Sequence, residues 1–433
     1  MINIKLKYHD GMIEIPTPPG RCIGTLEGRE IQSIKNPKEA ILMALDNPIE
    51  SPPLRNMIPK DGRITIMVSD RTRNTRLDIV LPVILKYLND HGVTQERIHI
   101  LICLGTHKSH TQENIVKLLG EDVCSKFSYC ESKHEQDEEY VYVGTTPRGT
   151  PVHFRREAVE SKLLIATGGI TFHYFAGFSG GRKGFLPGCS SFRTIQHNHK
   201  MTYMTNPDGE LVRNPSCESG RLDCNPLSED MIDAFRLMPV PSFLVNVVLN
   251  PKSEIALVFA GDVVKAHRAG CTEFKKLYIL PIVEQADLVI ASPGGYPLDI
   301  NLLQSHKSMV NASRAVKTGG KLLVAANCVE GVNLDRYPDF VKEHGHEELV
   351  RELQRNYEIL GGTTDNLMTM ADKIKIYLVS SLPIEYVKIL GMIPVDPSKN
   401  DWDKVFMDIG DSSTFYVMQS ASKFMPVVEQ SGR

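Results

Sequence analysis

The stretch RITIMVSDRTRNTRLDIVLPVILKYLNDHGVTQERIHILICLG, residues 63–105, predicts a strand, a helix and a second strand in succession. Its two apolar runs, at 63–70 and 97–105, are nearly continuous rather than alternating, which is typical of strands buried on both faces. Between them, residues 77–92 carry apolar side chains at helical spacing and end at a glycine. This succession is the unit of α/β folds with parallel sheets.

The rest of the chain repeats the pattern. Apolar runs of strand length recur at 162–169, 243–250, 287–295, 321–328 and 375–382. The sequence therefore predicts an α/β protein with mainly parallel sheets. A domain boundary is expected near 270–285, where a fresh strand–helix series begins. Residues 200–240, rich in Pro, Asn, Asp and Ser, are predicted to be a long loop, and residues 414–430 have helical spacing.

Composition narrows the class of function. The net charge of −3 gives no basic field for nucleic acid or for a membrane surface. No apolar run reaches the roughly 18 residues that a spanning helix needs. The nine cysteines are scattered without a CxxC pair, so neither a zinc ribbon nor a disulfide framework is indicated. We expect a reduced, cytoplasmic protein.

Polar clusters follow four of the predicted strands. They are SDRTR (69–73), GTHKSH (105–110), GGITFH (168–173) and GGYPLD (294–299). Ligands of parallel α/β sheets bind at the carboxyl ends of strands. The four clusters together therefore favour one composite site.

The third cluster continues into TFHYFAGFSGGRKGFLPG, residues 171–188. This loop is glycine-rich like a phosphate-binding P-loop, but Arg182 separates Gly181 from Lys183, and Gly184 takes the place of the required Ser or Thr. Apolar flanks suggest a buried Lys183, and burial lowers the pKa of an amine and frees it for covalent chemistry.

A His-x-His pair, His197 and His199, is a moderate metal signal. In a strand both rings share a face, whereas in a helix they diverge. No HExxH motif or cysteine set completes an ordinary zinc site. The pattern therefore indicates a metal whose other ligands are not protein side chains.

These motifs, taken in order, resemble the nickel-dependent lactate racemases. Asp70-Arg71-Thr72-Arg73 is similar to the Asp-x-Thr-Arg motif of that family, and residues 105–107 to its Gly-x-His motif. The block HYFAGFSGGRKGFLPG (173–188) and the block GGYPLDINLLQSHKSM (294–309) are long and specific matches. The first two motifs are weak alone.

The resemblance implies a role for each matching residue. It places His107 and His173 as the catalytic acid–base pair, Lys183 as the covalent anchor of the cofactor, and His199, sixteen residues later, as the nickel ligand. It assigns the cofactor site to Asp70, Arg71, Thr72, Arg73, Lys183, His199 and Lys307, and the substrate site to Arg73, Gln304 and Lys307. The loop glycines are expected to let the backbone approach the cofactor.

The implied cofactor is a nickel pincer nucleotide, a pyridinium-3-thioamide-5-thiocarboxylic acid mononucleotide joined to Lys183. The implied reaction inverts C2 of a 2-hydroxy acid. The α-hydrogen moves reversibly to the cofactor as hydride, and two histidines exchange the hydroxyl proton on either side. Separate enzymes build the cofactor and are transient partners, so protein from an ordinary expression host is expected to be empty.

The implied architecture has two α/β domains with the active site in the cleft between them. We expect the first domain at 1–272, the second at 275–405, and the segment 406–433 packed back on the first domain. Lactate-specific members of the family have a tryptophan near the substrate in the second domain, whereas this chain has only Trp402. The substrate is therefore lactate or a related 2-hydroxy acid with a larger or more polar side chain.

Two alternatives stay open at this point. One is a nucleotide-dependent transferase that uses residues 177–188 as a phosphate site. Against it, the Gly-Lys-Ser/Thr order and a clear acidic magnesium pair are missing. The other is a protein that binds the cofactor without catalysis, for which the two histidines would have no use.

Overall fold

The computed structural model describes residues 3–429, so residues 1–2 and 430–433, the extreme ends of two predicted segments, lie outside the described residues. The chain forms two compact units. The central unit comprises residues 30–276, and the terminal unit comprises residues 1–29 together with 277–433. Each unit is built on a six-stranded sheet, and most strand pairs are parallel. The predicted α/β class is thereby confirmed.

The sheet of the central unit has the strand order β15-β14-β9-β4-β5-β6, and only β15 runs antiparallel to its neighbour. The parallel order brings the carboxyl ends of β4, β5, β6 and β9 to one edge, where three of the four predicted polar clusters begin. The strands are β4 (Ile64–Ser69), β5 (Ile98–Cys103), β6 (Ser128–Glu131), β9 (Leu163–Gly169), β14 (Ser242–Leu249) and β15 (Ile255–Gly261).

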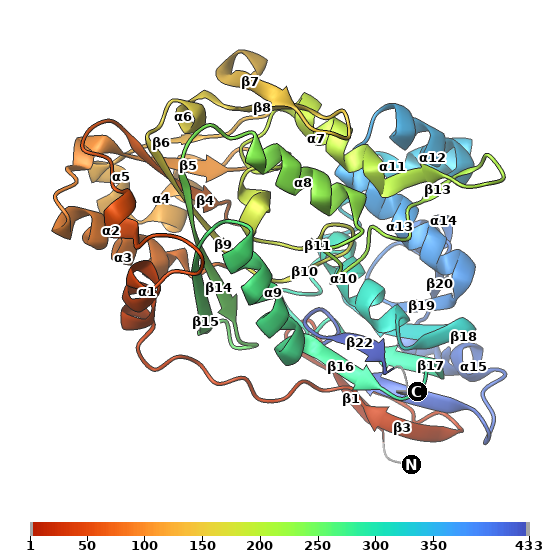
Figure 1. The fold of residues 1–433 in the computed structure, drawn as a ribbon. Coiled ribbons are helices and arrows are strands. Elements are labelled where there is room, and N and C mark those ends of the chain that lie inside the picture. Colours follow the sequence, from red (N-terminus) through yellow and green to blue (C-terminus); the bar gives the residue numbers. More distant parts are fainter. Residues whose placement is uncertain (1–2, 430–433) are drawn as a thin grey trace. The chain divides into compact units, whose positions relative to one another are not determined.

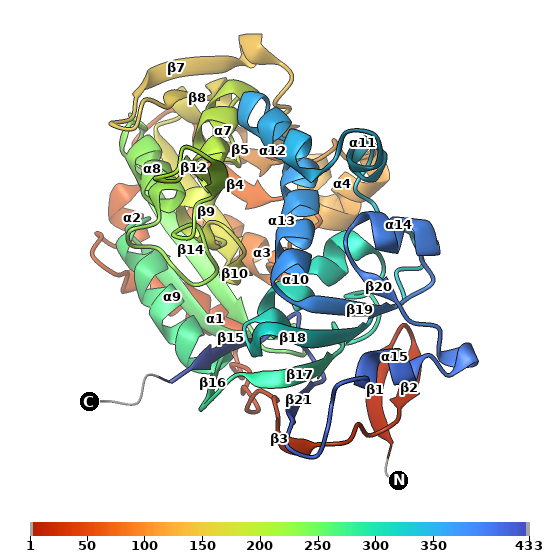
Figure 2. The same ribbon diagram turned by 90° about the vertical axis from the view of Figure 1, so that its right-hand side faces the viewer.

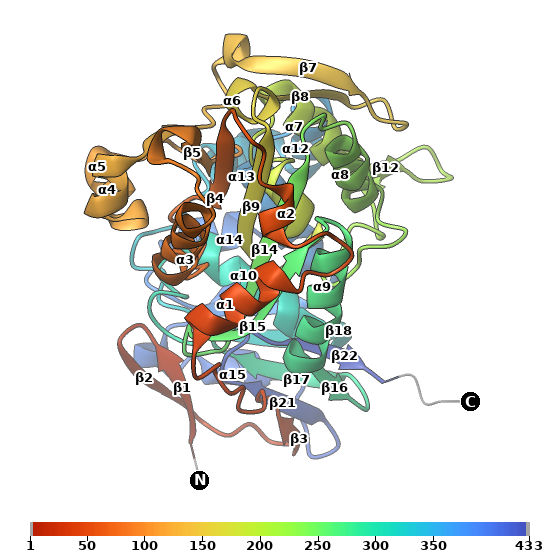
Figure 3. The same ribbon diagram turned by 60° about the vertical axis from the view of Figure 1, so that its left-hand side comes forward.

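Both faces of this sheet are buried, which explains the continuous apolar runs. Ile64, Ile66 and Val68 of β4 pack into one hydrophobic cluster, whereas Met67 packs into another on the opposite face. Figures 1 and 3 show α1, α2 and α3 on one side of the sheet and α7 and α8 on the other. These helices are α1 (Pro37–Asp46), α2 (Leu54–Met57), α3 (Leu77–Asp90), α7 (Phe192–His199) and α8 (Pro226–Arg236).

The terminal unit has an all-parallel sheet with the order β20-β19-β18-β17-β21-β3. Helices α10 (Leu302–Ser313) and α13 (Ile359–Lys373) pack against its strands (Figure 2). The strands are β3 (Arg21–Thr25), β17 (Ala286–Ala291), β18 (Val316–Ala325), β19 (Lys375–Val379), β20 (Ile393–Pro394) and β21 (Thr414–Met418).

The two ends of the chain differ from the predicted domain division. Strand β3, near the N-terminus, pairs with β21 of the terminal unit, and Leu6 and Ile15 of the preceding hairpin enter that unit's core. The hairpin consists of β1 (Ile4–Tyr8) and β2 (Gly11–Ile15). The described part of the segment expected at 406–433 also contributes strands to the terminal unit.

Two element predictions were wrong. Residues 414–430, expected to be helical, contain β21 and β22 (Met425–Val428), and β22 pairs with β16 (Ile279–Ile282). The expected loop at 200–240 contains helix α8 and the small hairpin of β12 (Tyr203–Thr205) and β13 (Leu211–Arg213). The strands form by pairing that local composition does not show, whereas α8 begins at a local signal, the Asn225 cap followed by Pro226.

The structure also answers the question of membrane spans for the helices it describes. Within residues 3–429, no helix combines the length and the hydropathy needed to cross a bilayer.

Candidate active site

Asp70 and His107 meet where β4 and β5 end. The Nδ1 atom of His107 lies 2.9 Å from Oδ2 of Asp70, which is 3% exposed. The other carboxylate oxygen accepts the backbone N–H of Thr72 at 2.7 Å, and the Asp70 carbonyl accepts the N–H of Arg73 at 3.1 Å. The Asp-Arg-Thr-Arg segment therefore turns tightly around Asp70.

The electrostatics of this pair fix the tautomer of a neutral His107. Burial alone raises the pKa of the Asp70 carboxyl, but hydrogen bonds from His107 and Thr72 and the charges of His107 and Arg73 outweigh it and hold that pKa well below its usual value. Asp70 is therefore an anion that accepts a proton-bearing Nδ1. A neutral His107 consequently has its proton on Nδ1 and a bare Nε2.

The lysine-bearing loop is held by two side chains from elsewhere in the central unit. Lys183 lies in a short 3₁₀ turn, η3 (Gly181–Gly184). Asn246, fully buried on β14, accepts the backbone N–H of Gly181 at 2.9 Å. The Nε2 atom of His267 lies 2.8 Å from the carbonyl oxygen of Ser179.

Arg182 is a structural residue of the loop. Its side chain is 1% exposed and donates to the carbonyl of Ala176 at 2.6 Å and to Oγ of Ser228 at 3.0 Å. Burial lowers its pKa to about 10, so it stays cationic at neutral pH. The residue that breaks the P-loop pattern thus ties the loop to α8.

The loop glycines are required by contacts within the protein. A Cβ on Gly177 would lie 2.1 Å from the carbonyl oxygen of Arg221. A Cβ on Gly181, whose φ is +52°, would lie 2.4 Å from the ring of His267. These contacts account for both glycines without the expected close approach to a cofactor.

Lys183 carries an amine that no described residue between 3 and 429 accepts in a hydrogen bond or an ion pair. Its Nζ lies 5.6 Å from the ring centroid of Phe175. Part of the side chain keeps accessible surface, but burial lowers the pKa of the amine well below its usual value. The charges of Arg73 and Arg182 lower it further. Lys183 is therefore a lysine with an increased fraction of neutral, nucleophilic amine.

His199 also packs against Phe175. It ends α7, is 1% exposed, and its ring centroid is 5.2 Å from that of Phe175. Burial, and then the charge of Lys183, lowers its pKa to about 3, so it is a neutral imidazole, the form that binds metals. His197 is exposed, since the two rings diverge on the helix as expected.

Asn198, between the two histidines, anchors this end of α7. Its Nδ2 donates to the buried carboxylate of Asp230 at 2.9 Å and to the carbonyl of Leu227 at 3.1 Å. Thr146 and Thr150 also donate to Asp230, at 2.5 and 2.8 Å. The orientation of His199 therefore rests on a buried, well-bonded network.

His173 is the third predicted residue next to Phe175. Its ring lies edge-on to that of Phe175 at 4.4 Å between centroids. Its Nδ1 accepts the backbone N–H of Ala176 at 3.3 Å. The structure therefore brings His173, Lys183 and His199 together around one buried aromatic ring.

Gln304 and Lys307 belong to the terminal unit. Both lie on α10, where Nζ of Lys307 donates to Oε1 of Gln304 at 2.7 Å on an exposed surface. Asn301 caps the helix by accepting the N–H of Gln304 at 2.9 Å. Asp299, fully buried in the same motif, accepts the N–H of His9 at 2.6 Å and so joins the motif to the N-terminal hairpin.

The residues around Phe175 suit a group that brings its own metal ligands. Among residues 3–429, no cluster of three or more His, Cys, Asp or Glu side chains could hold a metal ion. His199 is a neutral imidazole, and within residues 3–429 no group accepts a hydrogen bond from the amine of Lys183. One ligand and one attachment point are what the implied nickel pincer nucleotide requires of the protein.

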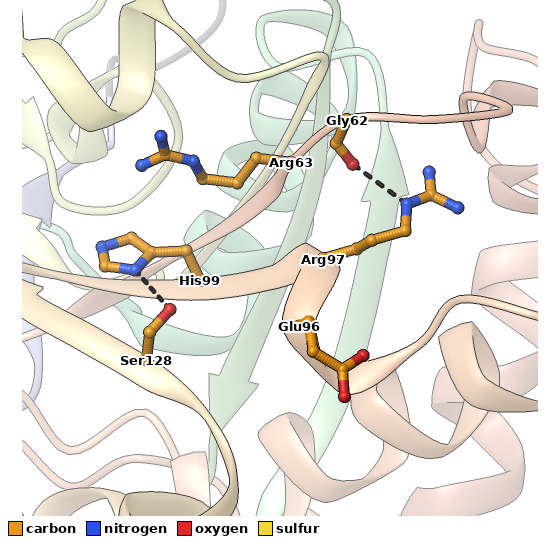
Figure 4. Close-up of a pocket in the computed structure, with 6 residues that line it drawn as sticks. All are labelled: Gly62, Arg63, Glu96, Arg97, His99 and Ser128. Atoms are coloured by element: carbon orange, nitrogen blue, oxygen red, sulfur yellow. Dashed lines mark hydrogen bonds between the residues drawn. The ribbon is translucent and has the colours of Figure 1, made fainter.

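A pocket of about 420 Å³ lies at the other edge of the central sheet (Figure 4). Its lining comes from the starts of β4, β5 and β6 and consists of Gly62, Arg63, Glu96, Arg97, His99 and Ser128. None of the predicted site residues lines it. The chemistry described above is therefore separate from this cavity.

Sequence reasoning missed three residues that organise the site. Phe175 stands inside the quoted HYFAG motif, and Asn246 is a polar residue in the middle of an apolar strand, FLVNVVLN. Both patterns are visible signals of a special role. His267 has no comparable signal, because its contact with the loop arises only from the packing of α9 (Lys265–Tyr278).

Comparison with known families matches both parts of the chain. The family described as "Lactate racemase N-terminal domain" matches residues 8–211, and "Lactate racemase C-terminal domain" matches residues 282–390.

Individual relatives agree with this. A lactate racemase of Lactiplantibacillus plantarum is 36% identical over 294 residues, which are 68% of this chain and 67% of the relative. A lactate racemase of Thermoanaerobacterium thermosaccharolyticum is 34% identical over 345 residues, or 79% of this chain and 78% of the relative. The solved structure of a lactate racemase apoprotein from that organism superposes with a TM-score of 0.87 at 28% identity, covering 99% of this chain and all of the other.

Proposed function

Because this chain belongs to the lactate racemase family and is thus an isomerase, we propose that it inverts C2 of lactate or a related 2-hydroxy acid with a nickel pincer nucleotide attached to Lys183. Lactate racemases depend on nickel as a family. The observation that carries the proposal is the arrangement of Lys183, His199 and His173 around Phe175.

The chain's own residues support this cofactor. Lys183 has an amine with a lowered pKa and no described acceptor, as covalent attachment requires. His199 would be the protein ligand of nickel, and Arg73 and the turn around Asp70 would hold the nucleotide. When bound, the group supplies an acceptor for the α-hydrogen as hydride. The proteins that build it are transient partners of this chain.

His107 is arranged as a base. The ionised Asp70 holds its Nδ1 proton, so the bare Nε2 takes the proton of the substrate hydroxyl. Asp70 then stabilises the resulting imidazolium, since the anion lies 2.9 Å away. Asp70 is therefore a positioning residue with an electrostatic share in the proton transfer.

His173 is arranged as the complementary donor. Because Nδ1 accepts the N–H of Ala176, a neutral His173 carries its proton on Nε2 and donates a hydrogen bond there. Delivery of a full proton needs the imidazolium form, in which Nδ1 is also protonated and the contact with Ala176 is released. One ring that accepts and one that donates is the combination that inversion of a hydroxy acid needs.

The substrate carboxylate is bound by cations. No residue between 3 and 429 is described as pairing with the guanidinium of Arg73, which is therefore available for a bidentate carboxylate contact. Lys307 adds a point charge, and Gln304 binds the substrate oxygen.

The side-chain specificity differs from that of a pocket walled by tryptophan. Trp402 is the only tryptophan of the chain, and it is 6% exposed in the core of the terminal unit. It is thus a core residue rather than a wall against the substrate. We propose that the substrate is lactate or a 2-hydroxy acid with a larger or more polar side chain, and all of these acids belong in the test.

The test is racemisation of single enantiomers by protein co-expressed with the cofactor-building enzymes and nickel, followed by chiral chromatography. We expect interconversion of at least one acid, and loss of about 100-fold or more in kcat for His107→Ala and for His173→Ala. The exposed His197→Ala serves as the matched control and keeps its activity. A loaded protein that inverts no acid of the panel, or a histidine variant near wild-type rate, contradicts the proposal.

A further inference from the structure

A buried histidine–glutamate pair lies beside the turn that carries Arg73. The side chains of His110 and Glu131 are 3% and 6% exposed. Oε1 of Glu131 accepts both the backbone N–H of His110 at 2.9 Å and its ring Nδ1–H at 2.7 Å. Because both bonds come from one residue, the position and the orientation of the imidazole are fixed together.

The other ring nitrogen of His110 reaches the neighbouring loop. Nε2 accepts the backbone N–H of Arg71 at 3.3 Å. This contact requires a ring that carries its proton on Nδ1, the tautomer that Glu131 selects. Glu131 is the last residue of β6, and Arg71 lies in the turn after β4. The pair therefore links the end of β6 to this turn.

The remaining N–H groups of the turn show why this contact matters. Those of Thr72 and Arg73 are accepted by Asp70 itself, within the same segment. Only the N–H of Arg71 is accepted by another loop, and that loop also carries His107, three residues before His110. His107 in turn bonds to Asp70. The two loops are thus joined at two points.

We propose that His110 and Glu131 are positioning residues that hold the Arg71–Arg73 turn in register with His107. The inference rests on the proposed function, in which Arg73 holds the carboxylate and His107 takes the proton. Displacement of one group against the other by about 1 Å is enough to lower a rate about 100-fold. Neither residue touches the substrate or the cofactor in this role.

A pair of substitutions separates the two bonds of the ring. His110→Gln places an amide oxygen near the position of Nε2 and keeps an acceptor for Arg71. His110→Asn keeps a donor near Nδ1 but loses that acceptor. We expect hydrogen exchange of the Arg71 amide in the cofactor-free protein to speed up about tenfold or more in His110→Asn and to change less than about threefold in His110→Gln.

In loaded enzyme, we expect kcat to fall about 10- to 100-fold in His110→Asn with KM within about threefold of wild type, and His110→Gln to recover most of kcat. The matched control is His99→Asn, which removes a ring that is 8% exposed at the far edge of the same sheet and bonds to Ser128 at 2.9 Å (Figure 4). It lowers thermal stability without changing exchange at Arg71.

A second pair, Glu131→Ala against Glu131→Gln, repeats the test should His110→Asn fail to fold, with faster exchange at Arg71 expected only for the alanine. Unchanged exchange and kcat in His110→Asn and Glu131→Ala, or equal losses in His110→Gln and His110→Asn, overturn the inference. A loaded wild type that inverts no acid instead overturns the proposed function, and the exchange measurement still decides the role of His110.

Discussion

Lys183 shows how single residues acquire their chemistry from burial. No described residue accepts a hydrogen bond from its amine, and Phe175 contributes only an aromatic face at 5.6 Å. Desolvation and two neighbouring arginines disfavour the charged form. Burial of this lysine lowers the free energy of unfolding of the cofactor-free protein. The same burial makes the amine more reactive.

The cost is testable through its pH dependence. Because the folded-state pKa of Lys183 is lowered from 10.5, the unfolded chain binds more protons between the lowered pKa and 10.5. Stability from this group therefore rises with pH through that window. We expect cofactor-free Lys183→Met to be more stable than wild type at about pH 7, with the difference shrinking as the pH rises toward 10.

Thermal unfolding of both proteins across this pH range measures the effect. Lys275→Met is the control, since Nζ of this exposed lysine also lies 5.6 Å from a phenylalanine ring, that of Phe178. A stability difference that does not depend on pH, or one equal to that of Lys275→Met, contradicts this account of Lys183.

At the scale of elements, the glycine-rich loop owes its shape to packing on β14 and α9. The sequence indicated the loop, its lysine and the neighbouring strands, because apolar runs and glycines are local signals. It did not indicate Asn246 or His267 as the groups that hold the loop, because those contacts join residues about 65 to 90 positions apart. The same limit explains the strands missed at 414–430, which form only by pairing with β17, β3 and β16.

Two glycines with positive φ separate backbone strain from packing. Gly92 has φ +81° and open space where a Cβ would lie, whereas Gly181 has φ +52° and would place a Cβ 2.4 Å from the ring of His267. We expect Gly92→Ala to cost about 1 kcal/mol and Gly181→Ala about 3 kcal/mol or more. Urea unfolding, monitored by hydrogen exchange in β9 and β14, measures the loss of stability in each variant. Equal losses would show that the His267 contact is unimportant.

At the scale of the whole molecule, the chain forms two α/β units, and the terminal one draws on both ends of the sequence. All seven predicted strands exist, since strands buried on both faces are apolar throughout. The pairing of β3 with β21, which lies almost 400 residues later in the chain, was not predictable. A short edge strand has no sequence signal that identifies its partner strand. Gln304 and Lys307, which the sequence motif assigned to the substrate, belong to the terminal unit.

The most direct test of the central claim is the intact mass of the protein co-expressed with nickel and the cofactor-building enzymes. Wild type is expected to carry an adduct of nucleotide mass on the peptide that contains Lys183. Lys183→Arg, which keeps the charge, is expected to lack it, and Lys108→Arg, at an exposed lysine, is expected to keep it. An unmodified wild type, under conditions that load a known lactate racemase, or an adduct that persists in Lys183→Arg, would contradict the account.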